Sequence, residues 1–176
     1  SLGVSNVKKF GRQDNFWGPT GAEGPCGPTT EIYVNGVEIW NIVFNEYYMK
    51  PDKSLELLKV KGVDTGMGLD RLAMAVQKKS NIFETDLFES IISRLPPHLD
   101  KKKKRIIADH MRGAAFLMAD GVRPSNKEAG YVLRHLIRRA MVYGQSQSFD
   151  LKQLLLTVTD LYGKFYRELN PSLILE

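Results

Sequence analysis

Two kinds of hydrophobic pattern divide the chain. Up to about residue 88, short runs rich in β-branched and aromatic residues alternate with Gly and Pro, which is typical of strands joined by turns. Beyond about residue 104, apolar residues recur every three to four positions with few interruptions, which predicts helices. The pattern therefore predicts an α+β chain whose N-terminal half is mixed and whose C-terminal half is all-helical.

The clearest strand signal is a hairpin centred on Asn35-Gly36. This dipeptide favours a two-residue turn, and it lies between Thr30–Val34 and Val37–Phe44, both of strand composition. We expect a third strand around Leu55–Val60 and a helix over Leu69–Gln77.

A glycine-rich stretch precedes the hairpin. In Gly18–Pro28, Gly occupies every third position. The few triplets are too short for a collagen helix, so we interpret the stretch as a loop whose backbone lies very close to another group.

The C-terminal half carries two strong helix signals. Ile106–Asp120 has apolar residues at helical spacing, so one face of this helix is expected in the core. Further on, Ser125 and Glu128 have the spacing of a capping box, which predicts a helix that starts at about Asn126.

That second helix has one apolar and one basic face. At 100° per residue from Arg134, the side chains of Arg138, His135 and Arg139 point to about 40°, 100° and 140°. Apolar residues from Val132 to Met141 occupy about 160° to 340°. An ordinary surface helix explains the apolar arc, but such a helix usually mixes charge signs on its solvated face. The basic face therefore favours contact with nucleic acid.

The net charge of the chain is modest but unevenly distributed. The whole sequence has 25 Lys and Arg against 20 Asp and Glu, a formal charge of +5. Residues 101–143 alone hold eleven basic and three acidic residues, a charge of +8. This excess is typical of a polyanion-binding surface, although Lys101–Lys104 taken alone indicates only a solvated charge run.

Composition excludes several classes of protein. With 43% hydrophobic and 26% charged residues the chain is of globular type. Cys26 has no second cysteine to pair with, and no apolar run approaches the roughly 20 residues of a membrane span. We expect a soluble, cytoplasmic protein with no membrane partner.

The same pattern predicts the domain organisation. Pro96-Pro97 and the lysine run indicate a linker over residues 91–104. This linker would join an α/β part, residues 1–90, to a helical part, residues 105–176.

Candidate chemistry lies in the segment Val63-Asp-Thr-Gly-Met-Gly-Leu-Asp-Arg71. Its Gly66-Met-Gly68 is neither a dinucleotide fingerprint nor a P-loop. The small residues would let a ligand lie against the backbone, Arg71 could neutralise a terminal phosphate, and Asp64 could hold an ammonium group or a ribose hydroxyl. Alternatively, Asp64 caps the helix and Arg71 forms a surface ion pair with Asp70 or Asp86.

No catalytic triad or metal-ligand spacing occurs in the sequence, so zinc is not expected. Chemistry that depends on positioning and electrostatics fits this absence. Formation of an adenylate from ATP and a carboxylate is one such reaction.

Several motifs together resemble the alanyl-tRNA synthetase family. In the N-terminal half these are Asp14-Asn-Phe-Trp17, Gly24-Pro-Cys-Gly-Pro28 with Thr30-Glu-Ile32, Ile39-Trp-Asn-Ile-Val-Phe44, and the Val63–Arg71 segment, which is similar to motif 3 of class II synthetases. In the C-terminal half they are Ile107-Ala-Asp-His110, Ala119–Asn126, Gly130–Arg134 and Ile137–Ala140. The resemblance implies part of a class II antiparallel sheet followed by a helical tRNA-recognition domain.

The resemblance also implies roles for individual residues. They are Arg71 for the ATP γ-phosphate, Gly66 and Gly68 for the adenosine pocket, Asp64 for the alanine ammonium, Trp17 and Val43 for the walls of the amino-acid pocket, Asn41 beside the substrate, Asn126 for the G·U wobble pair of the acceptor stem, and Arg134, Arg138 and Arg139 for nearby phosphates. The implied reaction is alanine–tRNA ligation, with alanine, ATP as its Mg²⁺ complex and tRNA(Ala) as substrates.

By the same comparison, the family's motifs 1 and 2, its editing domain and its oligomerisation region fall outside these 176 residues. We therefore expect a fragment that is inactive alone and needs the upstream and downstream parts of the same synthetase. Two other classes stay open. One is a stand-alone RNA-binding module derived from a synthetase, and the other is a DNA-binding helix-turn-helix protein.

Overall fold

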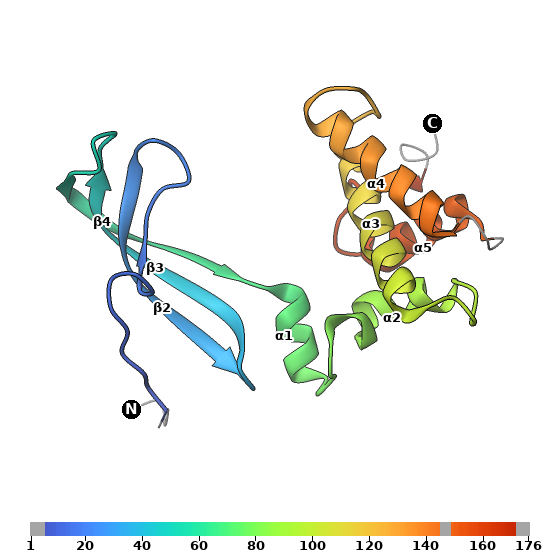
Figure 1. Cartoon of the computed structure of the whole chain (residues 1–176), viewed down its shortest axis with the longest axis horizontal. Coiled ribbons are helices and arrows are strands. Elements are labelled where there is room, and N and C mark those ends of the chain that lie inside the picture. The colour runs from blue at the N-terminus through green and yellow to red at the C-terminus, as the bar shows by residue number, and fades with distance from the viewer. Residues whose placement is uncertain (1–5, 145–148, 172–176) are drawn as a thin grey trace. The chain divides into compact units, whose positions relative to one another are not determined.

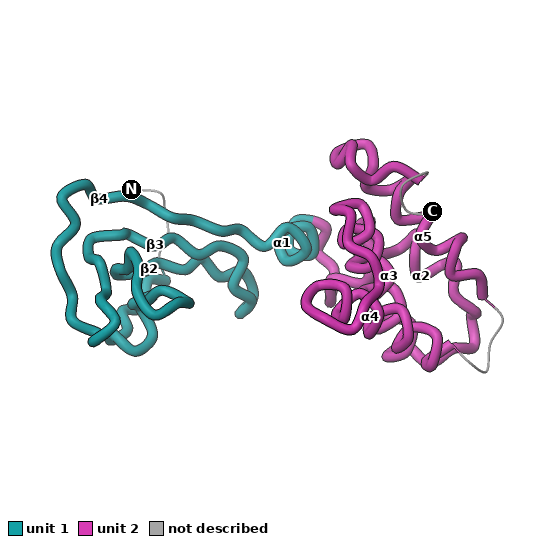
Figure 2. The backbone as a smooth tube through the Cα atoms, turned by 90° about the horizontal axis from the view of Figure 1, so that it is seen from above, with its two compact units in different colours: residues 1–76 teal, residues 77–176 magenta. Residues whose placement is uncertain are grey.

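The structure is a computed structural model that describes residues 6–144 and 149–171. It divides into two compact units, residues 1–76 and residues 77–176, which are coloured separately in Figure 2.

The described residues of the first unit form a four-stranded antiparallel sheet (Figure 1). Its strands, in spatial order, are β1 (Phe16–Trp17), β2 (Gly24–Val34), β3 (Val37–Met49) and β4 (Leu55–Met67). A helix, α1 (Leu69–Val76), follows β4 after one residue and packs against β3. The sheet and the helices of the second unit confirm the predicted α+β class.

The predicted hairpin turn is confirmed. Asn35 and Gly36 both have positive φ, 51° and 79°, and Val34 pairs with Val37 across the turn. This is the left-handed backbone that a two-residue turn requires and that Asn and Gly tolerate. The strands are longer than predicted, because β3 continues to Met49 and β4 to Met67.

The prediction of a loop over Gly18–Pro28 is wrong from Gly24 onward, where β2 begins. The expected close approach of the backbone does occur, at Gly27. A Cβ there would overlap the main-chain carbonyl oxygen of Phe44 on β3. The glycine is thus needed where β2 passes close to β3, at the register shift between Cys26 and Thr29.

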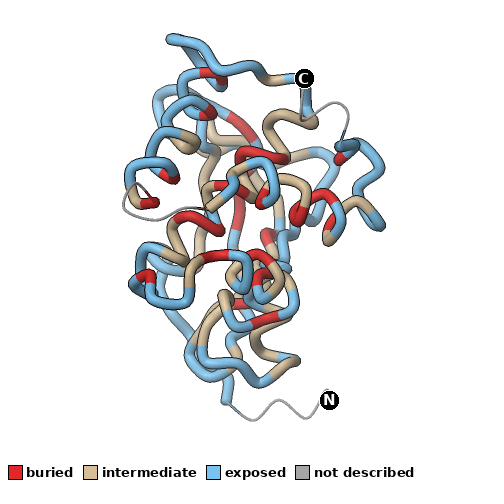
Figure 3. Tube along the Cα trace, turned by 90° about the vertical axis from the view of Figure 1, so that its right-hand side faces the viewer, coloured by how far each residue is buried: buried red, intermediate tan, exposed pale blue. Residues whose placement is uncertain are grey.

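The second unit is helical. Its elements are η1 (Ile82–Glu84), α2 (Asp86–Ser93), α3 (Lys101–Ala119), α4 (Glu128–Gly144) and α5 (Leu151–Tyr162). Phe88, Ile107, Met111 and Val158 lie in its core, with at most 1% of their surface exposed. Figure 3 marks such buried positions along the helices. In the described part of the first unit, the buried apolar side chains are only Cys26, Ile39 and Val43.

The lysine run is helical, although it was expected in a linker. Lys101–Lys104 forms the first turn of α3, because the Asp100 carboxylate caps the helix by accepting from the main-chain N–H groups of Lys102 and Lys103. The boundary between the two compact units falls between residues 76 and 77, ahead of the predicted boundary at residue 90.

The capping box predicted before α4 does not form. The helix begins at Glu128, and the Ser125 hydroxyl bonds to the main-chain N–H and carbonyl of Lys127 instead. The predicted apolar arc was also too wide, because Val132 and Met141 at its edges are about half exposed, at 49% and 51%.

None of the helices in the described residues is long and apolar enough to cross a membrane.

Candidate functional site

One face of the sheet collects most of the predicted alanine-binding residues. Asn41 of β3 pairs with Gly66 of β4, and Val43 pairs with Asp64. Residues directly opposite one another in an antiparallel pair point to the same face, and so do residues two apart on one strand. Asn41, Val43, Asp64 and Gly66 therefore share a face, although 20 positions or more of sequence separate the two strands at these pairs.

The four residues differ in what they offer a ligand. Val43 is buried, with 5% exposed, whereas Asp64 is exposed next to it. No atom lies within 4 Å of the place a Cβ would take at Gly66, so its main chain is open to a ligand. An apolar side chain, a carboxylate and an accessible glycine main chain thus lie next to one another.

Trp17 lies on a different strand from this group. It belongs to β1 and pairs with Gly27 of β2, so β2 separates it from Val43. Its side chain is 39% exposed.

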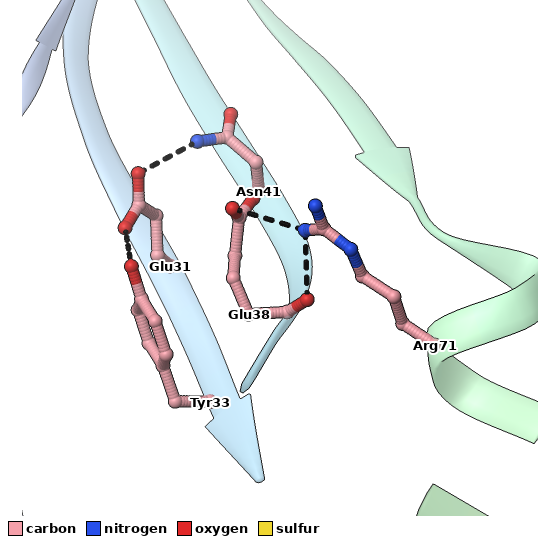
Figure 4. Close-up of polar contacts among 5 residues, drawn as sticks. All are labelled: Glu31, Tyr33, Glu38, Asn41 and Arg71. Atoms are coloured by element: carbon pink, nitrogen blue, oxygen red, sulfur yellow. Dashed lines mark hydrogen bonds and ion pairs between the residues drawn. The ribbon is translucent and has the colours of Figure 1, made fainter. Parts of the chain in front are cut away.

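A polar network extends the same face toward the hairpin turn (Figure 4). The Glu31 carboxylate accepts hydrogen bonds from the Tyr33 hydroxyl at 2.6 Å and from Asn41 Nδ2 at 3.4 Å. The hydrogen bond that Tyr33 donates to Glu31 is the largest cause of the raised pKa of Tyr33, because ionisation of the phenol would remove the donated proton. Glu31 therefore fixes the amide of Asn41, and the motif-based prediction had given Glu31 no role.

The helix that follows β4 brings in Arg71. Its Nη1 donates to the main-chain carbonyl of Glu38 at 3.0 Å and to the Glu38 carboxylate at 3.2 Å (Figure 4). A Cβ at Gly68 would lie 3.3 Å from Cδ of Arg71, so glycine leaves room for the arginine stem. This ion pair with Glu38 differs from the sequence-based alternative, in which the partner was Asp70 or Asp86.

A β-bulge explains why the sequence did not reveal Glu38. Tyr33 pairs with Glu38, but Ile32 pairs with Trp40, so Ile39 is an extra residue on β3. The main-chain N–H of Gly68 donates to the Ile39 carbonyl at 2.9 Å. Gly68, which follows β4, thus provides a hydrogen-bond donor for the carbonyl of the bulged residue. Arg71 bonds to Glu38, the residue just before the bulge.

The predicted nucleic-acid residues lie together in the second unit. Arg134, Arg138 and Arg139 are all exposed on α4, and Nη1 of Arg134 donates to Oδ1 of Asn126 in the loop before the helix. The Arg139 guanidinium lies 5.6 Å from the ring centroid of Tyr143.

Gly130 allows the loop before α4 to lie against the helix. A Cβ there would collide with the Ser125 hydroxyl and the Arg123 carbonyl, and the Ser125 N–H donates to the Gly130 carbonyl at 3.0 Å. This contact holds the loop that carries Asn126.

Comparison with known proteins identifies the family. The model of the class II (A) tRNA synthetases matches residues 2–173. The chain belongs to this family. The resemblance to alanyl-tRNA synthetases read from the motifs is therefore confirmed.

Curated relatives carry the name alanine–tRNA ligase. Those of Petrotoga mobilis, Borrelia hermsii and Treponema denticola are 38%, 39% and 40% identical to this chain over 94%, 98% and 99% of its length. The chain spans only 23% to 35% of these synthetases.

Proposed function

We propose that the chain is the part of an alanine–tRNA ligase that binds alanine and ATP on its sheet and the tRNA(Ala) acceptor stem on its helices. The identity of 38% to 40% with alanine–tRNA ligases over almost the whole chain is the observation that carries the proposal. In the reaction, the alanine carboxylate attacks the α-phosphorus of ATP and releases pyrophosphate. A ribose hydroxyl at the tRNA end then attacks the alanyl carbonyl and releases AMP.

The shared sheet face supports the assignment of the alanine site. Asp64 would bind the alanine ammonium, since a charge in such a site needs a partner of opposite sign. Val43 beside it would contact the small methyl side chain, and Trp17 would form a second wall. Glu31 holds the Asn41 amide next to this position.

The strand end and α1 support the assignment of the ATP site. The open main chain at Gly66 would contact the adenosine together with Gly68, which leaves room for the Arg71 stem, and Arg71 would bind the γ-phosphate through its planar fork. Among the described residues, no group of three or more His, Cys, Asp or Glu could hold a metal ion. Mg²⁺ would enter as part of the ATP complex, since it is commonly held by substrate phosphates.

The α4 surface would receive the acceptor stem. Asn126 would contact the G·U wobble pair in the wide, shallow minor groove of the RNA helix, and Arg134, Arg138 and Arg139 would bind phosphates beside it. The Arg134–Asn126 hydrogen bond supports a common role for these two residues.

The activity would belong to a longer protein in the cytoplasm. The relatives named as alanine–tRNA ligases are about three to four times as long as the region that this chain matches. We expect no ATP–pyrophosphate exchange from the 176 residues by themselves, and measurable exchange would contradict this expectation.

Asp64→Asn in the full-length protein tests the alanine site. It should raise KM for alanine in ATP–pyrophosphate exchange by at least about 10-fold, because a charged pair is lost, and should change KM for ATP little. Glu56→Gln, at the other end of β4, is the matched control and should change neither constant. A larger effect of Asp64→Asn on ATP than on alanine would overturn the assignment.

The alternative of a stand-alone RNA-binding module shares the tRNA contacts but not the chemistry. The exposed basic face of α4 is the observation that favours it. RNA binding without exchange activity in the full-length protein would support this alternative.

A further inference from the structure

The outward face of α4 carries an aromatic pair between its arginines. The rings of Tyr131 and His135, one helical turn apart, are stacked with centroids 6.0 Å apart and an interplanar angle of 28°. Tyr131 is 55% exposed, and His135 is also exposed. At 100° per residue, Tyr131 and His135 point to about 60° and 100° from Arg134, so they lie between Arg138 and Arg139 around the helix.

We propose that the Tyr131–His135 pair is a stacking platform for an unpaired nucleobase of RNA, whose neighbouring phosphate Arg138 binds. The inference rests on the proposed function and deepens it, because it adds a base-contacting pair to a surface for which only phosphate and wobble-pair contacts were expected.

Charge favours RNA over protein as the occupant of this face. Three arginines surround the rings, and the one acidic residue of α4, Glu128, is at its first position, about two turns before His135. Arg138 has no hydrogen-bond or ion-pair partner within the part of the chain that the structure describes, so its guanidinium is available to a phosphate. A face whose charges are nearly all positive is the footprint expected of a partner with a phosphate backbone.

The aromatic pair favours an unpaired base over a duplex. Bases inside an RNA helix are stacked on one another and offer no free face, whereas bases in single-stranded ends and loops stack on exposed Tyr and His rings. A nearby guanidinium adds cation–π attraction and binds the adjoining phosphate. The platform therefore fits a single-stranded end or loop next to the phosphates that the arginines hold.

The test compares two RNA hairpins of the same stem sequence, one with a single-stranded 3′ overhang and one blunt, for binding to the full-length protein. Tyr131→Leu keeps the apolar bulk but removes the aromatic face, and should weaken binding of the overhang hairpin about 10-fold while changing the blunt hairpin less than about 2-fold. Tyr131→Phe keeps the ring and should bind both hairpins as the unchanged protein does. Thermal unfolding of each variant checks that the helix is intact.

Photo-cross-linking supplies an independent readout. An overhang that carries 5-iodouridine should cross-link to the peptide containing Tyr131 or His135. Cross-linking elsewhere, together with unchanged overhang binding by Tyr131→Leu, would overturn the platform.

A third variant separates this inference from the proposed function. Arg138→Gln should weaken the binding of both hairpins and lower the salt dependence of that binding, because one phosphate contact is lost. If Arg138→Gln has this effect but Tyr131→Leu has none, the platform is wrong and the RNA surface stands. If both variants bind both hairpins normally, the assignment of α4 to RNA is wrong as well.

Discussion

Arg71 of α1 is held by Glu38 of β3 through both the main-chain carbonyl and the side-chain carboxylate, at 3.0 and 3.2 Å. The residue proposed to bind the ATP γ-phosphate thus also has an anionic side chain within bonding distance on β3. Both side chains are partly exposed, at 52% and 34%, so their ion pair is weak and can be exchanged for a phosphate.

Competition between Glu38 and ATP is therefore expected. Glu38→Gln should lower KM for ATP or leave it unchanged in ATP–pyrophosphate exchange by the full-length protein, because Arg71 keeps its carbonyl contact and loses only the competing charge. Arg71→Gln should raise the same KM about 10- to 100-fold, since a charge-assisted bond to phosphate is lost. If Glu38→Gln raised KM as much as Arg71→Gln does, Glu38 would position the arginine and not compete for it.

Gly27→Ala should destabilise the sheet by about 1–3 kcal/mol or more, because the new Cβ would overlap the Phe44 carbonyl oxygen and force β2 away from β3. Gly62→Ala is the matched control, since nothing lies within 4 Å of a Cβ there. Both tryptophans, Trp17 and Trp40, are in the first unit, so intrinsic fluorescence during urea unfolding reports on the sheet. Equal urea midpoints for the two variants would show that the sheet does not need a glycine at position 27 for its stability.

Replacement by alanine should change the free energy of unfolding in opposite directions at two helical glycines. Gly130→Ala should lower the free energy of unfolding, since its Cβ would collide with Ser125 and Arg123. In Gly113→Ala of α3, the new Cβ would lie at an ordinary contact distance of 3.7 Å from Leu136. This substitution should stabilise the protein by up to about 1 kcal/mol, because alanine has the higher helix propensity. Circular dichroism at 222 nm during thermal unfolding measures both. If Gly130→Ala were neutral, the loop before α4 would not depend on that close contact.

The Tyr33–Glu31 bond should be visible in a titration. Glu31→Gln removes the carboxylate that raises the pKa of Tyr33, so this pKa should fall toward its ordinary value of about 10. Because the pKa is raised in the folded state, the stability that the bond contributes is present below the ordinary pKa and is lost as pH rises through the raised pKa. NMR of the Tyr33 ring carbon Cζ follows the titration, and an unchanged midpoint in Glu31→Gln would assign the shift to another cause.

Local signals predicted the turn and the helices α1, α3 and α4. Asn35-Gly36 is a turn in isolation, and the apolar repeat of α3 depends only on its own residues. The strand ends could not be predicted in this way, because residues past Phe44 and Val60 are strands only through the pairing of β3 with β4. Asp100 before the lysine run was a helix-start signal that the linker interpretation overlooked.

The site was predictable only where the alternation of side chains applies. Counting two by two along β3 places Asn41 and Val43 on one face. Counting from the turn would pair Glu31 with Trp40, but the bulge at Ile39 shifts the partner to Asn41. The carbonyl of the bulged residue Ile39 accepts from Gly68, which is distant in sequence. Neither the Glu31–Asn41 bond nor the Arg71–Glu38 pair could therefore be predicted from the local pattern.

The geometry at Asn126 gives a sharp test of wobble-pair contact. Its Oδ1 accepts from Arg134, so the side-chain N–H groups remain to donate to an RNA acceptor. Asn126→Asp keeps the acceptor for Arg134 but removes these donors, whereas Asn126→Ala removes both. If donation to the wobble pair matters, both variants should lower aminoacylation of tRNA with the G·U pair by about 10-fold or more, while ATP–pyrophosphate exchange stays unchanged. A normal rate for Asn126→Asp would mean that Asn126 acts only by holding Arg134, and equal losses on G·U and G·C tRNA would assign it a structural role in the loop.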